Sequence, residues 1–206
     1  MIIIVDYGLG NLQSIQSKIE RLGYKDVRIA ADAGELERAA KLILPGVGHF
    51  AEGMKNIRQY GLLEVLNRKV LQDKVPVLGI CLGMQLLTRH SEEGDVDGLG
   101  WIDGVTKRFN FSMLLEKPRV PHVGWNSVSF RTDSLLSRGL APDQRFYFTH
   151  SYCVSCDSEQ DAVGTTHYGY DFVSVVQKGN IFGTQFHPEK SHKHGLQMID
   201  NFLRFA

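Results

Sequence analysis

Short apolar runs alternate with helical patterns throughout the first eighty residues of this chain. Each run ends at a polar residue, a glycine or a turn, as the buried strands of a parallel sheet do. The pattern predicts strands over residues 2–5, 27–30, 42–44 and 75–80, and helices over residues 11–22, 35–40, 51–59 and 62–72. This strand-then-helix order predicts an α/β fold with three layers, in which an open, mostly parallel sheet has helices on both faces.

The pattern changes beyond residue 100 to short alternating runs, which are typical of antiparallel strands. The expected strands are 104–109, 127–130, 145–154, 162–168, 172–177 and 181–186. The turn residues Lys178, Gly179 and Asn180 predict a hairpin between the last two. An amphipathic helix over 196–205 closes the chain. Since no linker, repeat or low-complexity segment interrupts the pattern, we expect one domain over residues 1–206.

Charge and cysteine usage exclude several classes of protein. Lys plus Arg and Asp plus Glu number 23 each, with no block of like charge, which argues against nucleic acid or an anionic membrane as a partner. The opening apolar run ends at Asp6 and is far too short for a signal peptide or a membrane span. Three cysteines fit a reducing compartment better than a disulfide framework. We therefore expect a cytoplasmic protein.

Cys81 stands between Gly79 and Gly83, where the fourth apolar run meets a helical pattern. Gly-x-Cys-x-Gly at such a junction matches the nucleophile elbow, whose sharp turn leaves no room for side chains two residues away on either side. A helix that begins near Leu82 would direct free N–H groups toward the sulfur, favouring the thiolate, and the Leu82 N–H could donate to an oxyanion. The motif alone is equally compatible with a buried structural cysteine in a tight turn.

His187 and Glu189 form a second candidate constellation. In extended backbone, side chains two residues apart lie on the same side, and Pro188 between them disfavours helix. A carboxylate that accepts from one imidazole nitrogen leaves the other nitrogen free for Cys81. An isolated His-x-Glu pair is more often an exposed loop histidine beside an acid. Together with the elbow, however, the pair favours a cysteine–histidine–glutamate hydrolase or transferase.

Two patterns that suggest a metal or a cofactor are incomplete. His150, Cys153 and Cys156 have a spacing found among zinc ligands, but no fourth ligand is evident and strand residues three apart point to opposite faces. Gly8 and Gly10 follow the first predicted strand without the rest of a dinucleotide fingerprint, and no phosphate-binding P-loop is present. We expect neither a metal nor a cofactor.

Three motifs carry a family resemblance: GICLGMQ around Cys81, QFHPE at 185–189 and PGVG at 45–48. They resemble the class I glutamine amidotransferase family. The segments PGVGHF, PHVGWN at 121–126 and THSY at 149–152 are most similar to one branch of it, the glutaminase subunits of imidazole glycerol phosphate synthases in histidine biosynthesis. The likeness covers nearly the whole chain and implies that Cys81, His187 and Glu189 hydrolyse glutamine through a cysteine thioester.

The resemblance also implies roles for other residues. A second oxyanion donor is the Val47 N–H, and the amino acid end of glutamine contacts Gly48, Gln85, Glu93, His150, Ser151 and Tyr152. Ammonia released into neutral water becomes ammonium, and the chain has no second active site to use it. The resemblance accordingly implies a heterodimer with a (β/α)₈-barrel cyclase subunit, and the residues expected at the interface are His122, Trp125, Asn126 and Lys178.

Two other function classes remain open. A different amidotransferase could serve anthranilate, guanylate or pyridoxal synthesis, although PHVGWN and the PGVG turn argue against it. A redox-stress chaperone or peptidase with an elbow cysteine is the other class, but it gives His187 and Glu189 no obvious place. Segments 109–117 and 157–161 match no motif. An assay of glutamine hydrolysis separates the second class from an amidotransferase.

Overall fold

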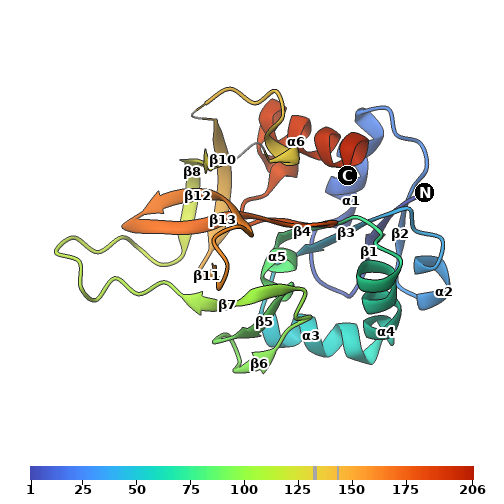
Figure 1. The fold of residues 1–206 in the computed structure, drawn as a ribbon, viewed down its shortest axis with the longest axis horizontal. Coiled ribbons are helices and arrows are strands. Elements are labelled where there is room, and N and C mark those ends of the chain that lie inside the picture. Colours follow the sequence, from blue (N-terminus) through green and yellow to red (C-terminus); the bar gives the residue numbers. More distant parts are fainter. Residues whose placement is uncertain (132–133, 143) are drawn as a thin grey trace.

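A mixed sheet runs through the computed structural model, which describes residues 1–131, 134–142 and 144–206 (Figure 1). Its parallel part consists, in spatial order, of β2 (Val27–Ala30), β1 (Ile2–Val5), β3 (Lys41–Gly46), β4 (Val77–Cys81) and β14 (Ile181–Thr184). Helices α1 (Leu12–Arg21) and α6 (His192–Phe205) cover one face of these strands. The other face carries α2 (Ala33–Leu36), α3 (Phe50–Gln59), α4 (Leu62–Asn67) and α5 (Leu82–Leu86). The predicted three-layer arrangement is confirmed.

The parallel strands are buried on both faces, and their side chains divide between two hydrophobic cores. Alternate residues of a strand point to opposite faces, so neighbours in sequence enter different cores. One core joins α3 and α4 to the sheet and includes Ile3, Val5, Leu42, Leu44, Val77, Met54 and Leu62. The other joins α1 and α6 to it and includes Ile2, Ile4, Ile43, Leu78, Ile15, Ile19 and Met198. Burial on both faces explains why the strands are continuous apolar runs.

Mainly antiparallel strands extend the sheet on its other side. In spatial order they are β13 (Tyr170–Lys178), β11 (Tyr152–Cys156), β7 (Ile102–Arg108), β5 (Thr88–Ser91) and β6 (Val96–Asp97). Beside β13 lie β12 (Ala162–Tyr168) and β9 (Ser129–Phe130), while β8 (His122–Ser127) and β10 (Arg145–His150) form a separate antiparallel pair. The predicted hairpin is confirmed, since Lys178 at the end of β13 pairs with Ile181 at the start of β14.

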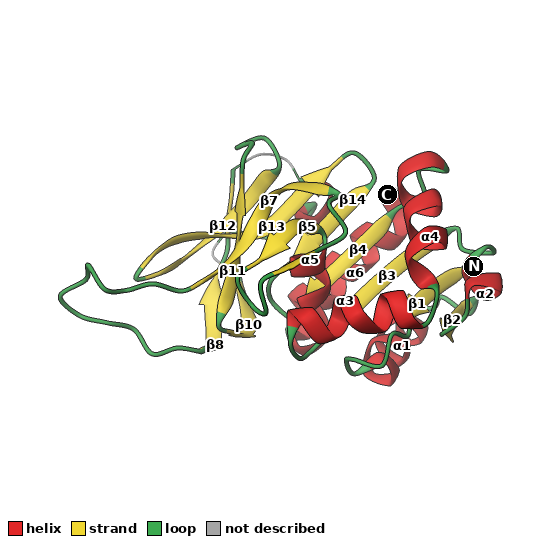
Figure 2. Cartoon of the chain, turned by 90° about the horizontal axis from the view of Figure 1, so that it is seen from below, coloured by secondary structure: helices red, strands yellow, loops and turns green. Residues whose placement is uncertain are grey.

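The structure corrects the prediction of one strand over residues 145–154. The chain leaves the two-stranded sheet after β10 and enters the large sheet with β11, and Ser151 lies between the two. The sequence prediction also missed β5, β6 and β8. The segment predicted as a strand over 127–130 is divided between the end of β8 and β9. The long arm between β7 and β8, which extends away from the rest of the chain in Figure 2, matches no predicted element.

Several predicted helix and strand bounds were also wrong, for local reasons. The Asp32 side chain caps α2 by accepting from the Glu35 N–H at 3.0 Å, so this helix begins at Ala33 and ends at Leu36. Strand β3 continues through Pro45 to Gly46, and α6 begins at His192. The helix after Cys81 is only five residues long. The predicted helix over 62–72 continues beyond α4 as a π-helical turn, Arg68–Gln72.

Candidate functional site

Cys81 is the last residue of β4 and has a strained backbone conformation, with φ +54° and ψ −108°. The flanking glycines are required by packing. A Cβ added at Gly79 would lie 2.8 Å from the backbone of Gly83, and a Cβ added at Gly83 would collide with the carbonyl oxygen of Leu44. The turn therefore forms only with glycine at both positions, and it holds the 5% exposed thiol at the end of the strand.

His187 and Glu189 form a buried pair after β14. The Nδ1–H of His187 donates to Oε1 of Glu189 at 2.8 Å, and the two side chains are 2% and 3% exposed. The predicted reason for this pairing was wrong. Pro188 starts a 3₁₀ turn, Pro188–Lys190, so the side chains converge across a helical turn and not along a strand. The His187 backbone is fixed by its N–H, which donates to the Tyr147 carbonyl at 2.9 Å.

The electrostatics of this pair favour a charged imidazole. Burial acts to lower the pKa of His187, but the interactions with the Cys81 thiol and the Glu189 carboxylate outweigh it and raise the pKa to about 9. Nε2 of His187 and Oε2 of Glu189 are buried without a hydrogen-bond partner in the described part of the chain. Because Nδ1 is bound to Glu189, Nε2 is the nitrogen that is left for chemistry next to the thiol.

A cavity of about 250 Å³ opens over the thiol. It brings together the residues expected to form the oxyanion and substrate sites. These are Val47, Gly48, Leu82, Gln85, Glu93, His150, Ser151 and Tyr152, which line the cavity together with Cys81, Pro121 and Thr149. They come from both parts of the sheet, and Ser151 reaches the cavity because the chain changes sheets there. Pro121 was not among the predicted site residues, although it begins the PHVGWN motif.

Gln85 and Gln185 form a polar wall behind the sulfur. The amide Nε2 of Gln85 donates to the Tyr152 carbonyl at 2.9 Å and to Oε1 of Gln185 at 3.1 Å. The side-chain oxygen Oε1 of Gln85 is left to accept from a ligand. Nε2 of Gln185 lies 3.9 Å from the Cys81 sulfur. Sequence reasoning gave Gln185 no role. The available signal was a polar residue in an apolar strand end, two positions before His187.

The glycine turn next to Cys81 is built by close packing and one special backbone angle. The buried Tyr7 hydroxyl donates to the Pro45 carbonyl, and burial raises the pKa of this phenol, as does the nearby Cys81. A Cβ at Gly46 would collide with the Tyr7 hydroxyl and lie 2.9 Å from the Leu82 side chain. Gly48, in contrast, has φ +142°, which favours glycine. Gly46 is thus required by its contacts, and Gly48 by its conformation.

The structure does not bring the four predicted interface residues together. His122 is 2% exposed and stacks on Tyr168 with ring centroids 4.0 Å apart, so its side chain does not form a surface. Trp125 is 39% exposed and stacks on His192 at 5.0 Å, and Asn126 donates to the His167 carbonyl at 2.9 Å. These positions are buried or half-exposed parts of one strand, β8.

Lys178 lies elsewhere in the molecule. Its partner in the hairpin is Ile181, which is level with Val77 at the end of β4 remote from Cys81. Its ammonium group pairs with Asp103 at 2.8 Å. A different lysine, Lys190, lies over the Tyr147 ring, and that ring contacts Trp125 with centroids 6.0 Å apart.

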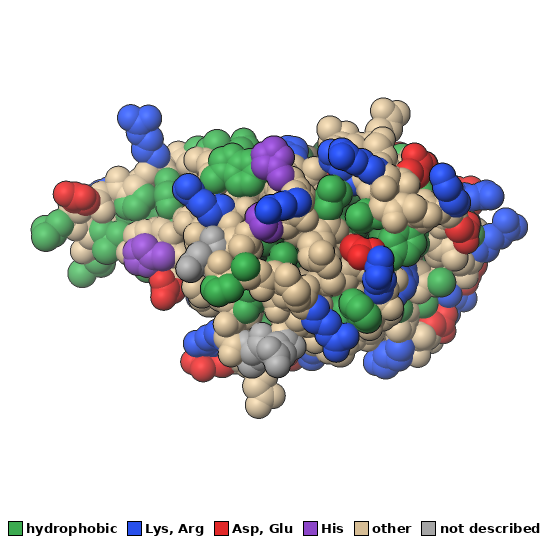
Figure 3. Space-filling model, turned by 90° about the horizontal axis from the view of Figure 1, so that it is seen from above, with side chains coloured by type: hydrophobic (Ala, Val, Ile, Leu, Met, Phe, Trp, Pro, Cys, Tyr) green, Lys and Arg blue, Asp and Glu red, His purple; other side chains and the backbone are tan. Residues whose placement is uncertain are grey.

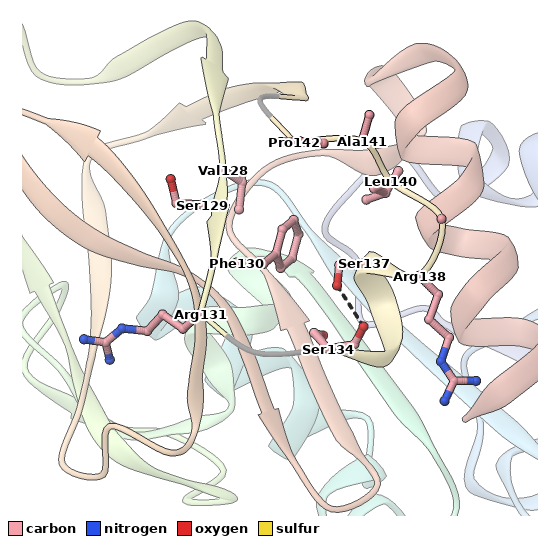
Figure 4. A pocket seen from close by; sticks show the side chains of 11 residues that line it. Val128, Ser129, Phe130, Arg131, Ser134, Ser137, Arg138, Leu140, Ala141 and Pro142 are labelled. Carbon is pink, nitrogen blue, oxygen red and sulfur yellow. Dashed lines mark hydrogen bonds between the residues drawn. The ribbon is translucent and has the colours of Figure 1, made fainter.

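A larger cavity, about 1030 Å³, is separate from Cys81 (Figure 4). It lies between Val128–Arg131 and Ser134–Pro142, and the guanidinium groups of Arg131 and Arg138 point away from it. Arg131 pairs with Glu159 at 3.8 Å, and Arg138 covers the Phe205 ring. Among the residues drawn, serines are present but no cysteine, histidine or carboxylate that could activate them, and no free cation is directed into the cavity, so it is not the candidate site.

None of the described residues contributes to a cluster of three or more His, Cys, Asp or Glu side chains arranged to hold a metal ion. Likewise, none of the helices they form has both the length and the apolar character of a membrane span. Burial raises the pKa of the Cys153 thiol to about 11 and that of Cys156 to about 12, so both thiols stay protonated at neutral pH.

Comparison with known proteins gives consistent matches along the whole chain. Residues 3–205 match the family model described as glutamine amidotransferase class-I. The chain is 49% identical over 206 residues to imidazole glycerol phosphate synthase subunit HisH 2 of Methanococcus maripaludis, covering 100% of both chains. It is 47% identical to subunit HisH of Moorella thermoacetica, covering 98% of this chain and 93% of that protein.

Solved structures show the same fold at much lower sequence identity. A structure described as a glutamine amidotransferase has a TM-score of 0.72 at 18% identity, with 98% of this chain and 97% of that chain covered. The structure of PurLQS from Thermotoga maritima has a TM-score of 0.74 at 16% identity, with 99% and 97% covered. These two likenesses concern the fold alone.

Proposed function

We propose, from the premise that this chain belongs to the class I glutamine amidotransferase family, that it is the glutaminase subunit of an imidazole glycerol phosphate synthase. It hydrolyses glutamine to glutamate and ammonia, and a cyclase subunit uses the ammonia to make imidazole glycerol phosphate and aminoimidazole carboxamide ribotide in histidine biosynthesis. The relatives that are 42–49% identical over almost their full length are all named as subunits of that synthase.

One observation carries the catalytic part of the proposal. The buried His187–Glu189 pair leaves Nε2 unpaired beside a thiol on a strained elbow, and a cavity opens over that thiol. An unpaired buried nitrogen costs free energy, and a catalytic role is one reason for such a group to be retained. A structural cysteine would need neither the charged pair nor the cavity. We therefore assign Cys81, His187 and Glu189 as the catalytic residues.

The reaction follows from the positions of these groups. With a pKa of about 9, His187 carries a proton at neutral pH, and the imidazolium stabilises a Cys81 thiolate. The thiolate attacks the side-chain amide carbon of glutamine. His187 Nε2 protonates the departing nitrogen as the carbon–nitrogen bond breaks, which releases ammonia and leaves a glutamyl thioester. His187, now neutral, takes a proton from water, which attacks the thioester and releases glutamate and Cys81.

The remaining cavity residues stabilise the oxyanion and hold the substrate in this proposal. Leu82 and Val47 line the cavity together with Cys81, and their N–H groups would donate to the tetrahedral oxygen. Helix α5 has only five residues, so the free N–H groups of its first turn, and not the dipole of a long helix, would stabilise the negative charge. Gly48, Gln85, Glu93, His150, Ser151 and Tyr152 would hold the amino acid end of glutamine.

The proposal includes a partner subunit that receives the ammonia. The relatives are named as subunits, which implies a second subunit. We propose that this partner is a (β/α)₈ barrel and that it binds the face that carries Trp125, Asn126 and Lys190. On one face of the molecule, histidine side chains lie beside hydrophobic and basic ones, a composition suited to an interface (Figure 3). A single glutaminase domain over residues 1–206 and a cytoplasmic location complete the proposal.

The test uses the complex purified with its partner subunit. Cys81→Ala should abolish glutamine-dependent synthesis, while the complex still turns over with added ammonium salt, because only the supply of ammonia is lost. Cys153→Ala is the matched control, since that buried thiol stays protonated. It should retain both activities.

Two results would contradict the proposal. If the Cys81→Ala complex also fails with ammonium, Cys81 serves folding or docking. If the wild-type complex does not hydrolyse glutamine at all, the elbow cysteine belongs to a different class of protein, such as a peptidase or a stress chaperone.

A further inference from the structure

We propose that His122 is a positioning residue, which holds His150 in a single neutral tautomer and thereby fixes the Ser151–Tyr152 wall of the cavity over Cys81. The inference deepens the proposed function and rests on it, since this wall is the one assigned to the amino acid end of glutamine. Neither histidine touches the reacting atoms in the mechanism above.

A chain of hydrogen bonds joins Tyr152, His150 and His122, and the Tyr152 carbonyl fixes the direction of each bond in it. Nδ1 of His150 lies 2.8 Å from the Tyr152 carbonyl, which can only accept, so Nδ1 carries the proton. Nε2 of a neutral His150 must then accept. It lies 3.1 Å from Nδ1 of His122, which is therefore the donor. His122 Nε2 becomes an acceptor in turn and faces the amide Nδ2 of Asn126 at 3.4 Å. Each imidazole therefore has one neutral tautomer that is compatible with both of its hydrogen bonds.

Both rings are held neutral by their surroundings. Burial lowers the pKa of His150 to about 3, with smaller lowering contributions from His122 and His187, and burial lowers the pKa of His122 to about 4. Aromatic rings surround the pair: Phe148 and Tyr168 stack on His122, and Phe109 and Phe172 contact His150. A neutral buried imidazole needs a donor for its second nitrogen, and His122 supplies it.

The network ends at the Tyr152 carbonyl, which also accepts from Gln85 at 2.9 Å. Gln85 in turn bonds to Gln185, whose amide lies 3.9 Å from the Cys81 sulfur. Residues 150–152 are where the chain passes from β10 to β11, so two different sheets hold the residues on either side of Ser151, whose own carbonyl accepts from the Phe109 N–H at 3.1 Å. Without the His122 donor, Nε2 of His150 is left buried with no partner, so the ring turns away to find one and the Tyr152 carbonyl loses one of its two donors.

Mere ring packing is the competing explanation, because His122 also stacks at 4.0 Å on Tyr168 and at 4.8 Å on Phe148. Three variants separate the two explanations. His122→Phe keeps a ring and removes the donor. His122→Asn loses the ring but keeps an N–H donor at the same distance along the side chain as Nδ1. Phe148→Leu disturbs the packing around His122 and leaves the hydrogen bonds in place.

The first measurement is the glutaminase activity of the complex with its partner subunit. We expect His122→Phe to raise the KM for glutamine about tenfold, the scale of one lost buried hydrogen bond, with kcat within about twofold of the wild type. His122→Asn should restore the KM, and Phe148→Leu should leave it near the wild-type value. Equal increases in the KM for Phe148→Leu and His122→Phe would overturn the proposal, as would failure of His122→Asn to restore it.

The second measurement does not depend on activity. Nitrogen-15 NMR of the labelled chain distinguishes the two neutral tautomers of histidine. The signal of His150, assigned by its absence in His150→Gln, should report a proton on Nδ1 in the wild type and in His122→Asn. A proton on Nε2 in the wild type would overturn the network even if glutamine hydrolysis is normal. If His122→Phe does not fold, the wild-type tautomer and the variants His122→Asn and Phe148→Leu still distinguish the hydrogen-bond explanation from ring packing. A failure of the proposed function appears separately, as the absence of glutamine hydrolysis in the wild-type complex.

Discussion

Two histidine–carboxylate pairs in this molecule have almost the same geometry in opposite environments. His187 and Glu189 lie 2.8 Å apart behind the parallel strands and are 2% and 3% exposed. His167 and Asp171 lie 2.7 Å apart at the turn between β12 and β13 and are 73% and 72% exposed. In both pairs Nδ1 of the imidazole faces a carboxylate oxygen.

The comparison teaches that burial, and not contact, gives a pair its chemical role. Water screens the exposed pair, and such pairs contribute about 0–1 kcal/mol to stability. In the buried pair the carboxylate and the thiol are the main groups that can compensate the charge of the imidazole, and they raise the pKa of His187 to about 9.

Neutralising the carboxylate of each pair gives the widest contrast. Glu189→Gln keeps the shape of the side chain but removes the charge that stabilises the imidazolium, so we expect kcat for glutamine to fall by a factor of about a thousand or more. Asp171→Asn makes the same chemical change in the exposed pair and should leave kcat unchanged. Steady-state kinetics of the complex provide the measurement, with circular dichroism to verify folding. Near-normal turnover of Glu189→Gln would remove this residue from the catalytic set.

The His187–Glu189 pair is already formed in the free chain. If the free chain hydrolyses glutamine slowly, the group that is not yet in place must therefore belong to the oxyanion site. The Gly46–Val47 peptide is the candidate, and Gly48, with φ +142°, is the residue about which it could rotate. We expect the isolated chain to bind glutamine but hydrolyse it slowly. Partner plus the cyclase substrate should raise turnover by at least about a hundredfold, the scale of one oxyanion donor. Equal rates for the free chain and the complex would exclude a switch in this turn.

The buried pair should also make stability depend on pH. The pKa of His187 rises from an ordinary 6.5 to about 9 on folding, so its contribution is fully present below pH 6.5 and is lost as the pH rises through 9. The difference in free energy of unfolding between wild type and Glu189→Gln should accordingly shrink between these values. Denaturant titrations at several pH values measure it. A constant difference across that range would show that Glu189 does not raise the pKa of the imidazole.

The smallest effect is expected for the stability of the exposed pair. Asp171→Asn should change the free energy of unfolding at neutral pH by no more than about 0.5 kcal/mol, since surface pairs contribute little. Raising the salt concentration should remove even that difference. A loss of several kcal/mol would mean that the hairpin between β12 and β13 depends on this contact, and the contrast between the two pairs would then fail.

Sequence patterns predicted the parallel part of the fold well because its signals are local. Each buried strand is an apolar run bounded by a turn, and the prediction of β1 and β2 was correct to the residue. The elbow could also be predicted, since its glycines lie two residues on either side of Cys81, but the contact with Leu44 of β3 that requires Gly83 could not. The family motifs then supplied the cavity residues, which no spacing rule would have grouped.

The antiparallel part was predicted less well because its decisive features are not local. Alternation continues through Ser151, so nothing in the sequence indicates that β10 and β11 belong to different sheets. His122 and Trp125 both lie in the motif PHVGWN, yet the first is buried by Tyr168 and Phe148, which lie far away in the chain. The partners of Gln185 and Lys178 likewise depend on strand order. Burial of a polar residue is settled by tertiary contacts that short patterns do not contain.

The packing of Gly79 and Gly83 distinguishes substitutions that destabilise the fold around the site from substitutions that only remove its reactive thiol. Because a Cβ at Gly83 would collide with the backbone of Leu44, substitution there forces α5 away from β3, a central strand of the sheet. In a mutational scan that records cellular abundance and growth side by side, variants of Gly79 and Gly83 should therefore be depleted in both readouts. Variants of Cys81 with small side chains should remain abundant and fail only in growth. The peptide turn and the thiol that it presents are thus under different selection.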